Sequence, residues 1–224
     1  MSTSVLALFV VVAVLVMGAV VLFAGERKRR EAALAQICSQ LGLAYQSKPF
    51  VSKLDPRWLP FSKIGALKGG HRRVTWGAFG SIHGRDILAI EHRYVVSTGQ
   101  VTSTVTHTCV ACRCPSFWPE IELRAERVLD RLADTFGAGD LQLESERFNR
   151  RWRVVTADAD TALAILTPDV QAMLEEAPRS EFWSIGRGWV VVCRRAVFKP
   201  DRLAAFLQRP LDLIARVPQE MLVE

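Results

Sequence analysis

The chain contains few cysteines and few histidines, five and four among 224 residues. An odd and small number of cysteines is not typical of a secreted domain built around disulfides. Glycine and proline are present at ordinary levels, fourteen and ten residues, which excludes collagen-like and low-complexity chains. Half of the residues are hydrophobic, so a mainly disordered chain is excluded as well. The length suits one domain with an appendage.

The sequence also lacks the common catalytic and nucleotide-binding motifs. It has no Gly-x-Ser-x-Gly elbow, no phosphate-binding loop, no dinucleotide fingerprint and no His-Glu-x-x-His metal motif. His71, His83 and His92 stand beside arginines or turns, without a carboxylate at the spacing of a proton relay. We therefore assign no catalytic residue and expect no cofactor.

One long stretch is free of charge. Residues 5–24 contain no charged or strongly polar side chain, and a helix of about 20 residues spans the roughly 30 Å hydrocarbon core of a bilayer. A signal peptide would carry its positive charge before such a stretch, whereas here the basic residues follow it. The pattern predicts a single transmembrane helix, with residues 1–25 as the anchor.

The basic residues that follow are Arg27, Lys28, Arg29 and Arg30. Positive residues close to a span stay in the cytoplasm, so we expect a single-pass cell-membrane protein with its N-terminus outside and its C-terminal domain cytoplasmic. The four side chains would lie at the anionic headgroups, where each contributes about 1 kcal/mol of attraction. They are the predicted membrane-surface site, and the lipid bilayer is the first predicted partner.

The rest of the chain predicts an α+β domain. Residues 26–44 form a basic juxtamembrane helix, because apolar residues recur at helical spacing up to Gly42. In the domain at 45–224, strands outnumber helices and tight turns join them, which favours a mainly antiparallel sheet with packed helices. The alternative is a pleckstrin-like barrel with a closing helix. Strands are expected at 73–79, 87–96, 101–114, 141–156, 182–186 and 189–195, and helices at 124–136, 158–166, 168–177 and from about 200 onwards.

A cluster of sulfur and imidazole groups provides candidate metal ligands: His107, Cys109, Cys112 and Cys114. Strand geometry places the first two on one face and the last two on the other, so they cannot converge on one ion within a strand. A structural zinc site also needs a second ligand pair, which the sequence does not supply. We expect buried cysteines here, and no structural disulfide in a reducing cytoplasm.

A basic segment with interleaved aromatic residues extends over 147–153. Arginines beside aromatic rings can bind nucleic acid, but no nucleic acid is expected, because a basic domain tethered to a negative leaflet already accounts for the charge. If Phe148 and Trp152 point to the core of a strand, the arginines face solvent. Arg147, Arg151 and Arg153 are the candidate binding site for an acidic protein partner.

The stretch 143–155, with its Glu-Ser-Glu-x-Phe-Asn-Arg block, is followed by an Ala-Leu-Ala-Ile-Leu-Thr-Pro segment at 162–168 and a hairpin at 183–192. Over residues 70–220 the chain resembles an actinobacterial-type family of membrane-anchored bacterial proteins of unknown function. The resemblance implies a bacterial cell-membrane setting and a structural role for Phe148, Asn149 and Arg150. It brings no catalytic residues, and the Cys112 and Cys114 pair is not part of its pattern.

These observations predict a binding protein. The cytoplasmic domain is expected to bind a partner protein or the anionic membrane surface. The alternative is a ligand sensor, or an enzyme that acts on a small or membrane-derived substrate. A large cavity among Trp76, Trp152, Trp183 and Trp189 would favour the sensor, and a filled core would exclude it.

Overall fold

The computed structural model describes residues 3–49, 60–61, 72–97, 99, 101–125 and 140–223. The helices are α1 (Thr3–Gln40), α2 (Glu146–Asn149), α3 (Ala159–Ile165), α4 (Pro168–Glu176) and α5 (Pro200–Ile214), followed by the 3-10 turn η4 (Gln219–Met221). The strands are β1 (Leu43–Ser47), β2 (Arg72–Ile82), β3 (Arg85–Ser97), β4 (Thr102–Arg113), β5 (Ile121–Ala125), β6 (Asp140–Leu141), β7 (Trp152–Thr156), β8 (Glu181–Gly186) and β9 (Trp189–Arg194).

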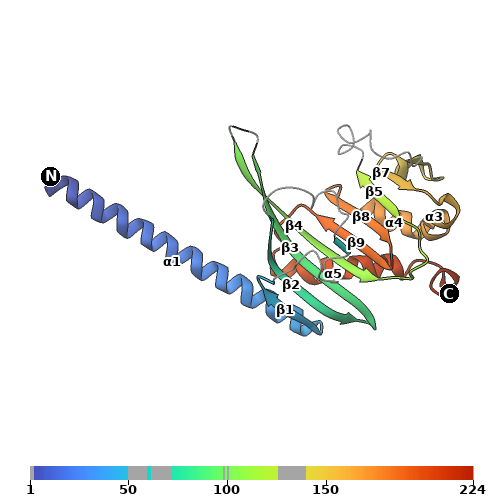
Figure 1. The fold of residues 1–224 in the computed structure, drawn as a ribbon, viewed down its shortest axis with the longest axis horizontal. Coiled ribbons are helices and arrows are strands. Elements are labelled where there is room, and N and C mark those ends of the chain that lie inside the picture. The colour runs from blue at the N-terminus through green and yellow to red at the C-terminus, as the bar shows by residue number, and fades with distance from the viewer. Residues whose placement is uncertain are drawn as a thin grey trace.

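The strands form one nine-stranded sheet in the order β1-β2-β3-β4-β9-β8-β5-β7-β6. Every pairing in it is antiparallel. With helices packed on this sheet, the described residues have an α+β fold (Figure 1). Because the sheet ends at β1 on one side and β6 on the other, it is open, and the alternative of a closed pleckstrin-like barrel is wrong.

Apolar side chains cover both faces of the sheet. The larger cluster joins the sheet to α3, α4, α5 and the C-terminal end of α1, and it contains Trp76, Trp152 and Trp183. A smaller cluster on the other face contains Phe61, Ile90 and Val191, and the partly buried Trp189 packs against it. The four tryptophans therefore do not enclose one cavity, and the feature that would have favoured a sensor is not present among them.

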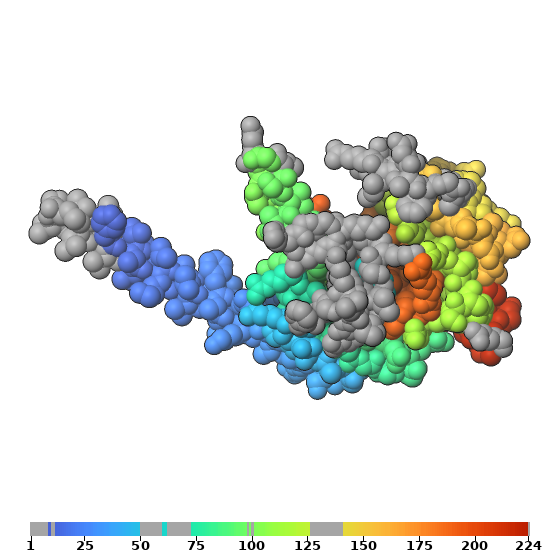
Figure 2. Space-filling view, in the orientation of Figure 1, coloured from blue at the N-terminus to red at the C-terminus, as the bar shows by residue number. Residues whose placement is uncertain are grey.

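Helix α1 extends away from the sheet as a rod, and the space-filling view shows its N-terminal part standing clear of the other elements (Figures 1 and 2). No helix within the described residues is long and apolar enough to cross a membrane. The predicted transmembrane helix over 1–25 is therefore wrong, and so is the single-pass localisation with an outer N-terminus and a cytoplasmic domain.

Two predicted elements differ from the structure. The strand expected over 141–156 is divided into β6, α2 and β7. It is interrupted because Ser145 caps α2, its hydroxyl accepting a hydrogen bond from the Phe148 N–H. Of the helix expected at 124–136, Arg124 and Ala125 belong to strand β5 instead, and the remainder lies outside the described residues.

Candidate functional site

The last turns of α1 are fixed to the domain by one face of the helix. Leu34 and Cys38 are fully buried in the larger core cluster. Residues at i, i+3 and i+4 share a face of a helix, so Arg30 and Arg27 continue the same face toward the N-terminus. The core residues thus direct these two arginines toward the sheet, and direct Lys28 away from it.

Opposite this face, strand β2 contains a β-bulge. Its register with β3 pairs Val74 with His92 and then shifts, so that Trp76 pairs with Glu91. Thr75 and Trp76 therefore both oppose Glu91. A bulge lets two consecutive residues face the same side, which regular alternation forbids. The bulge brings the Thr75 hydroxyl within hydrogen-bond distance of the Glu91 carboxylate, at 2.6 Å, while Trp76 is the register partner of Glu91.

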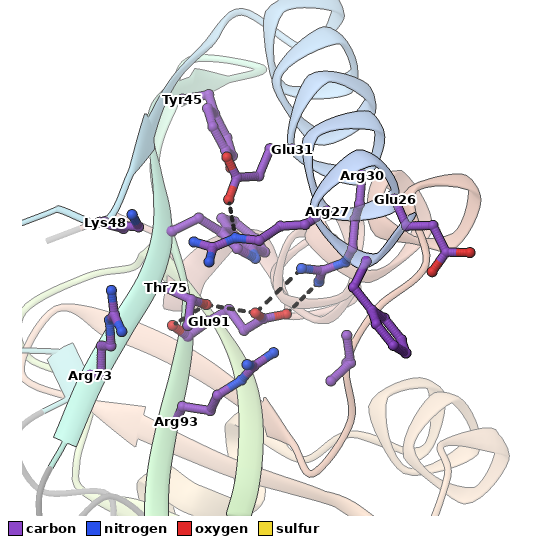
Figure 3. A pocket seen from close by; sticks show the side chains of 13 residues that line it. Glu26, Arg27, Arg30, Glu31, Tyr45, Lys48, Arg73, Thr75, Glu91 and Arg93 are labelled. Carbon is purple, nitrogen blue, oxygen red and sulfur yellow. Dashed lines mark hydrogen bonds and ion pairs between the residues drawn. The ribbon is translucent and has the colours of Figure 1, made fainter. Parts of the chain in front are cut away.

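Glu91 is the charged centre of this region, and its side chain is completely buried. Its carboxylate accepts hydrogen bonds from the Arg30 guanidinium at 2.5 and 3.5 Å and from the Thr75 hydroxyl at 2.6 Å (Figure 3). Arg30 also donates to the Phe198 carbonyl at 3.3 Å. A buried carboxylate must be paired and hydrogen-bonded to remain charged, and Glu91 meets both conditions. The pair links α1 to the sheet.

A pocket of about 380 Å³ opens between α1, β1, β2 and β3 around this ion pair (Figure 3). Its basic side chains are Arg27, Arg30, Lys48, Arg73 and Arg93; its acidic ones are Glu26, Glu31 and Glu91; the others are Phe23, Tyr45, Thr75, Trp76 and Val197. Arg27 is paired with Glu31 at 2.9 Å, as Arg30 is with Glu91. The pocket therefore combines satisfied ion pairs with a surplus of positive charge.

Several hydrogen-bond donors of the pocket find no acceptor within the part of the chain that the structure describes. The buried atoms Tyr45 Oη, Trp76 Nε1 and Arg30 Nε have no hydrogen-bond partner among the described residues. The rings of Tyr45 and Trp76 are stacked with their centroids 6.1 Å apart. Burial, the largest cause, and the nearby Glu31 raise the pKa of Tyr45 to about 12, so its hydroxyl stays a donor at neutral pH. Chemically, the pocket is suited to accept oxygen atoms that carry negative charge.

The four residues of the predicted membrane-surface site are not one group in the structure. Arg27 and Arg30 line the pocket, whereas Lys28 and Arg29 are exposed on α1 and do not line it. The sequence cluster is divided because neighbouring residues on a helix point about 100° apart. A role at a membrane surface stays a prediction for these residues.

The candidate partner-binding arginines are also placed differently from one another. Arg147 lies on α2 and pairs with Glu175 at 3.0 Å. Arg151 donates a hydrogen bond to the Ala177 carbonyl at the end of α4, and Arg153 lies in β7 opposite Arg124. Only Arg147 is widely exposed, because Arg151 and Arg153 are half-buried. The binding of an acidic partner at these positions remains a prediction.

Phe148 and Trp152 are buried as expected. The side chain of Asn149 bonds with both the N–H and the carbonyl of Leu143. These contacts hold the chain around α2 in place.

The cysteines follow the predicted division between the two faces of β4. Cys109 lies in the smaller cluster, whereas Cys112 and Cys114 lie in the larger one. No group of three or more possible metal ligands occurs within the described residues. Cys109 forms a disulfide with its neighbour across the strands, Cys193, so the expectation of no structural disulfide is wrong. Two cysteines far apart in sequence were brought together by the pairing of β4 with β9.

His107 gives the domain an expected sensitivity to acid. Its ring is buried and stacks on Tyr94 with the centroids 5.6 Å apart. Burial, and then repulsion by Arg195, lower its pKa from the ordinary value of 6.5. Since the folded protein then binds fewer protons than the unfolded chain, the free energy of unfolding should fall as the pH decreases below about 6.5.

We expect His107→Phe, which keeps an aromatic ring on Tyr94, to reduce this slope. Urea unfolding at pH 5 and pH 7.5 measures it. His83→Asn in the exposed turn between β2 and β3 is the control and should leave the slope unchanged. Equal slopes in the wild type and His107→Phe would contradict the prediction.

Most residues of the pocket were not found from the sequence. Arg27 and Arg30 were assigned to a membrane surface and Trp76 to a possible cavity; the missed residues are Phe23, Glu26, Glu31, Tyr45, Lys48, Arg73, Thr75, Glu91, Arg93 and Val197. One signal was present, because Glu91 follows the apolar run Ile87–Ile90 within a predicted strand. A carboxylate at a core position demands a cation from elsewhere in the chain. The sequence does not say which one, because Arg30 is 61 residues away.

Comparison with known proteins supplies a likeness of fold. No family model and no curated protein matches the sequence. Among solved structures, the chain is similar to the crystal structure of the mycobacterial trehalose monomycolate transport factor A, TtfA, with a TM-score of 0.56 and 15% sequence identity. The likeness covers 84% of this chain and 98% of that one. At this identity it shows that the two chains share a fold.

Proposed function

We propose that the protein is a non-catalytic binding factor in lipid transport, and that the pocket at the root of α1 receives the polar end of an amphiphile. The observation that carries the proposal is the shared fold, which extends over 98% of the solved chain of the transport factor TtfA. The transported molecule named for that protein, trehalose monomycolate, joins a sugar to a fatty acyl group. An accessory factor for such a molecule needs a polar site next to an apolar one.

The pocket supplies a polar site that lies next to an apolar surface. Its walls carry charged groups and hydrogen-bond donors that have no acceptor among the described residues, and Phe23 of α1 also lines it. From Val12 to Phe23 the apolar side chains of the helix are exposed. Exposed contiguous apolar surface marks a site for a partner or a lipid. A headgroup held beside Tyr45 would leave its acyl chain to run along this helix.

The test is binding of trehalose monomycolate to the full chain in mild detergent, counted by native mass spectrometry, with trehalose as the chain-free comparison. We expect the lipid to bind and trehalose to bind at least 10-fold more weakly, since about 0.8 kcal/mol is gained for each buried CH₂ group. Phe23→Ser should weaken lipid binding. Phe117→Ser, which removes another exposed phenylalanine remote from the pocket, is the matched control. Lipid binding that is absent, or equally reduced in both variants, would overturn the proposal.

A further inference from the structure

We propose that the pocket between α1 and β2–β3 is a binding site for a phosphate-class anion, either free or on a lipid headgroup, with Lys48, Arg73 and Arg93 as its charged ligands. The inference deepens the proposed function and rests on it for the choice of pocket. Its own argument comes from the charges and donors of that pocket.

The first observation is a pair of like charges. Arg73 in β2 and Arg93 in β3 are direct partners in the antiparallel register. Residues paired in this way have Cβ atoms about 5 Å apart on the same face, and like charges in such a pair are destabilising. Both side chains are exposed, line the pocket, and have no acidic partner among the described residues. An anion between the two guanidinium groups would remove the repulsion and could bind both as bidentate donors.

The second observation is the balance of charge. The two arginines of α1 are already neutralised, Arg27 by Glu31 and Arg30 by Glu91. Three further cations, Lys48, Arg73 and Arg93, remain against the single carboxylate of Glu26. The surplus of two positive charges matches a phosphate monoester, which carries about −1.5 to −2 at neutral pH. A neutral sugar alone would leave that surplus uncompensated.

The third observation is the set of unused donors. Trp76 is 1% exposed and its indole N–H, which can only donate, has no acceptor in the described part of the chain. The Tyr45 hydroxyl and Arg30 Nε are also buried donors without a hydrogen-bond acceptor among the described residues. A buried donor without an acceptor costs about 1–3 kcal/mol. Phosphate oxygens are acceptors, so an anion suits a pocket lined by residues with unpartnered donors, whereas a cationic ligand does not.

The backbone holds Lys48 in place. Its N–H donates to the Thr75 carbonyl at 2.9 Å, at the bulge of β2. Its φ of 49° lies in the left-handed region, which non-glycine residues rarely adopt and where strain often accompanies function. This conformation fixes the lysine at the rim, next to the strand that carries Arg73.

The experiment uses the full chain and two probes. Isothermal titration calorimetry measures binding of inorganic phosphate, and flotation compares vesicles of phosphatidylcholine with and without phosphatidic acid, a lipid whose headgroup is a phosphate monoester. A site for free phosphate binds the ion and shows no preference between the vesicles. A headgroup site prefers the vesicles that contain phosphatidic acid. Either outcome supports the proposal, and the two outcomes identify the source of the phosphate.

The variant Arg73→Gln/Arg93→Gln should weaken binding of the recognised probe by about 10-fold or more for each arginine, because hydrogen bonds to charged groups contribute about 1.5–3 kcal/mol. The control Arg179→Gln/Arg202→Gln removes the same charge from exposed arginines outside the pocket and should bind like the wild type. Thermal melting verifies that both variants fold.

The proposal is overturned if neither probe binds, or if the pocket variant and the control lose affinity equally. The proposed function is judged separately, because it depends on trehalose monomycolate and on Phe23. A chain that binds the lipid but neither phosphate probe would retain the function and lose the anion site.

Discussion

Replacing Glu91 with alanine is expected to lower the free energy of unfolding by about 3 kcal/mol, the cost of breaking a buried ion pair by removing one partner. The variant would leave the Arg30 guanidinium beside the sheet without its counter-charge and the Thr75 hydroxyl without its acceptor. Arg30 is 27% exposed, so water can solvate part of its charge. The loss in the free energy of unfolding should therefore lie at the lower end of the range of about 3–5 kcal/mol known for such changes. Urea unfolding monitored by circular dichroism measures the change.

The matched control is Glu31→Ala, which breaks the neighbouring pair with Arg27 on the surface of α1. Side-chain exposures of 58% and 32% place this pair near water, where such pairs contribute about 0.3–0.5 kcal/mol. The double variant Arg30→Met/Glu91→Leu removes both charges and should recover most of the stability lost in Glu91→Ala. If Glu91→Ala and Glu31→Ala had equal effects, the buried pair would not be what holds α1 to the sheet.

Removing the disulfide should have an effect of similar size. Cys109 and Cys193 close a loop with a sequence separation of 84 residues, and the chain-entropy model gives about 4–5 kcal/mol for a loop of that length, with a measured range of about 2–5 for native disulfides. We expect Cys109→Ala/Cys193→Ala, or the wild type in reductant, to lose stability in that range. Guanidinium unfolding with and without dithiothreitol measures it.

The double variant Cys109→Ala/Cys193→Ala is also the control for dithiothreitol, because this reagent should not change the stability of a chain that lacks the disulfide. The remaining thiols do not complicate the result. Cys38, Cys112 and Cys114 are buried. Burial raises the pKa of Cys38 to about 11 and that of Cys112 and Cys114 to about 12, so all three stay protonated and unreactive at neutral pH. Wild-type protein that unfolds identically with and without reductant would show that the bridge does not stabilise the fold.

Local signals in the sequence predicted local structure well. Thr167 caps α4, with its side chain accepting from the Val170 N–H, and Pro168 occupies the first turn, as the Thr-Pro-Asp motif indicates. The hairpin of β8 and β9 turns at Arg187 and Gly188, both with positive φ. Such features depend on neighbouring residues, so the order of the chain is enough to predict them.

Alternation of polar and apolar residues misled the prediction at 147–153. The spacing of Phe148, Trp152 and Val154 suits a strand, and all three are buried. However, Phe148 reaches the core from a single helical turn, not from a strand. The capping residue Ser145 and the acidic Glu146 were the available signals for that turn. The prediction that these side chains are buried was thus correct, but the backbone conformation predicted around Phe148 was wrong.

The pocket was beyond local prediction for a different reason. Its charged residues come from α1, from Lys48 just after β1, and from β2 and β3, and only the fold brings them together. The bulge at Thr75 also breaks the alternation that would otherwise have separated this residue from Trp76. Contacts between residues far apart in sequence, like the disulfide of Cys109 with Cys193, likewise cannot be predicted from neighbouring residues.

The way in which α1 is attached makes it a lever. The helix is joined to the domain near Arg30, Leu34 and Cys38, whereas its first residue, Thr3, lies 27 positions before Arg30, an arm of about 40 Å at 1.5 Å per residue. A tilt of about 5° at the joint therefore moves the far end by roughly 3–4 Å on that arm. The pocket lies beside this joint, so a small change in the geometry of the Arg30–Glu91 ion pair is magnified at the N-terminal end of α1.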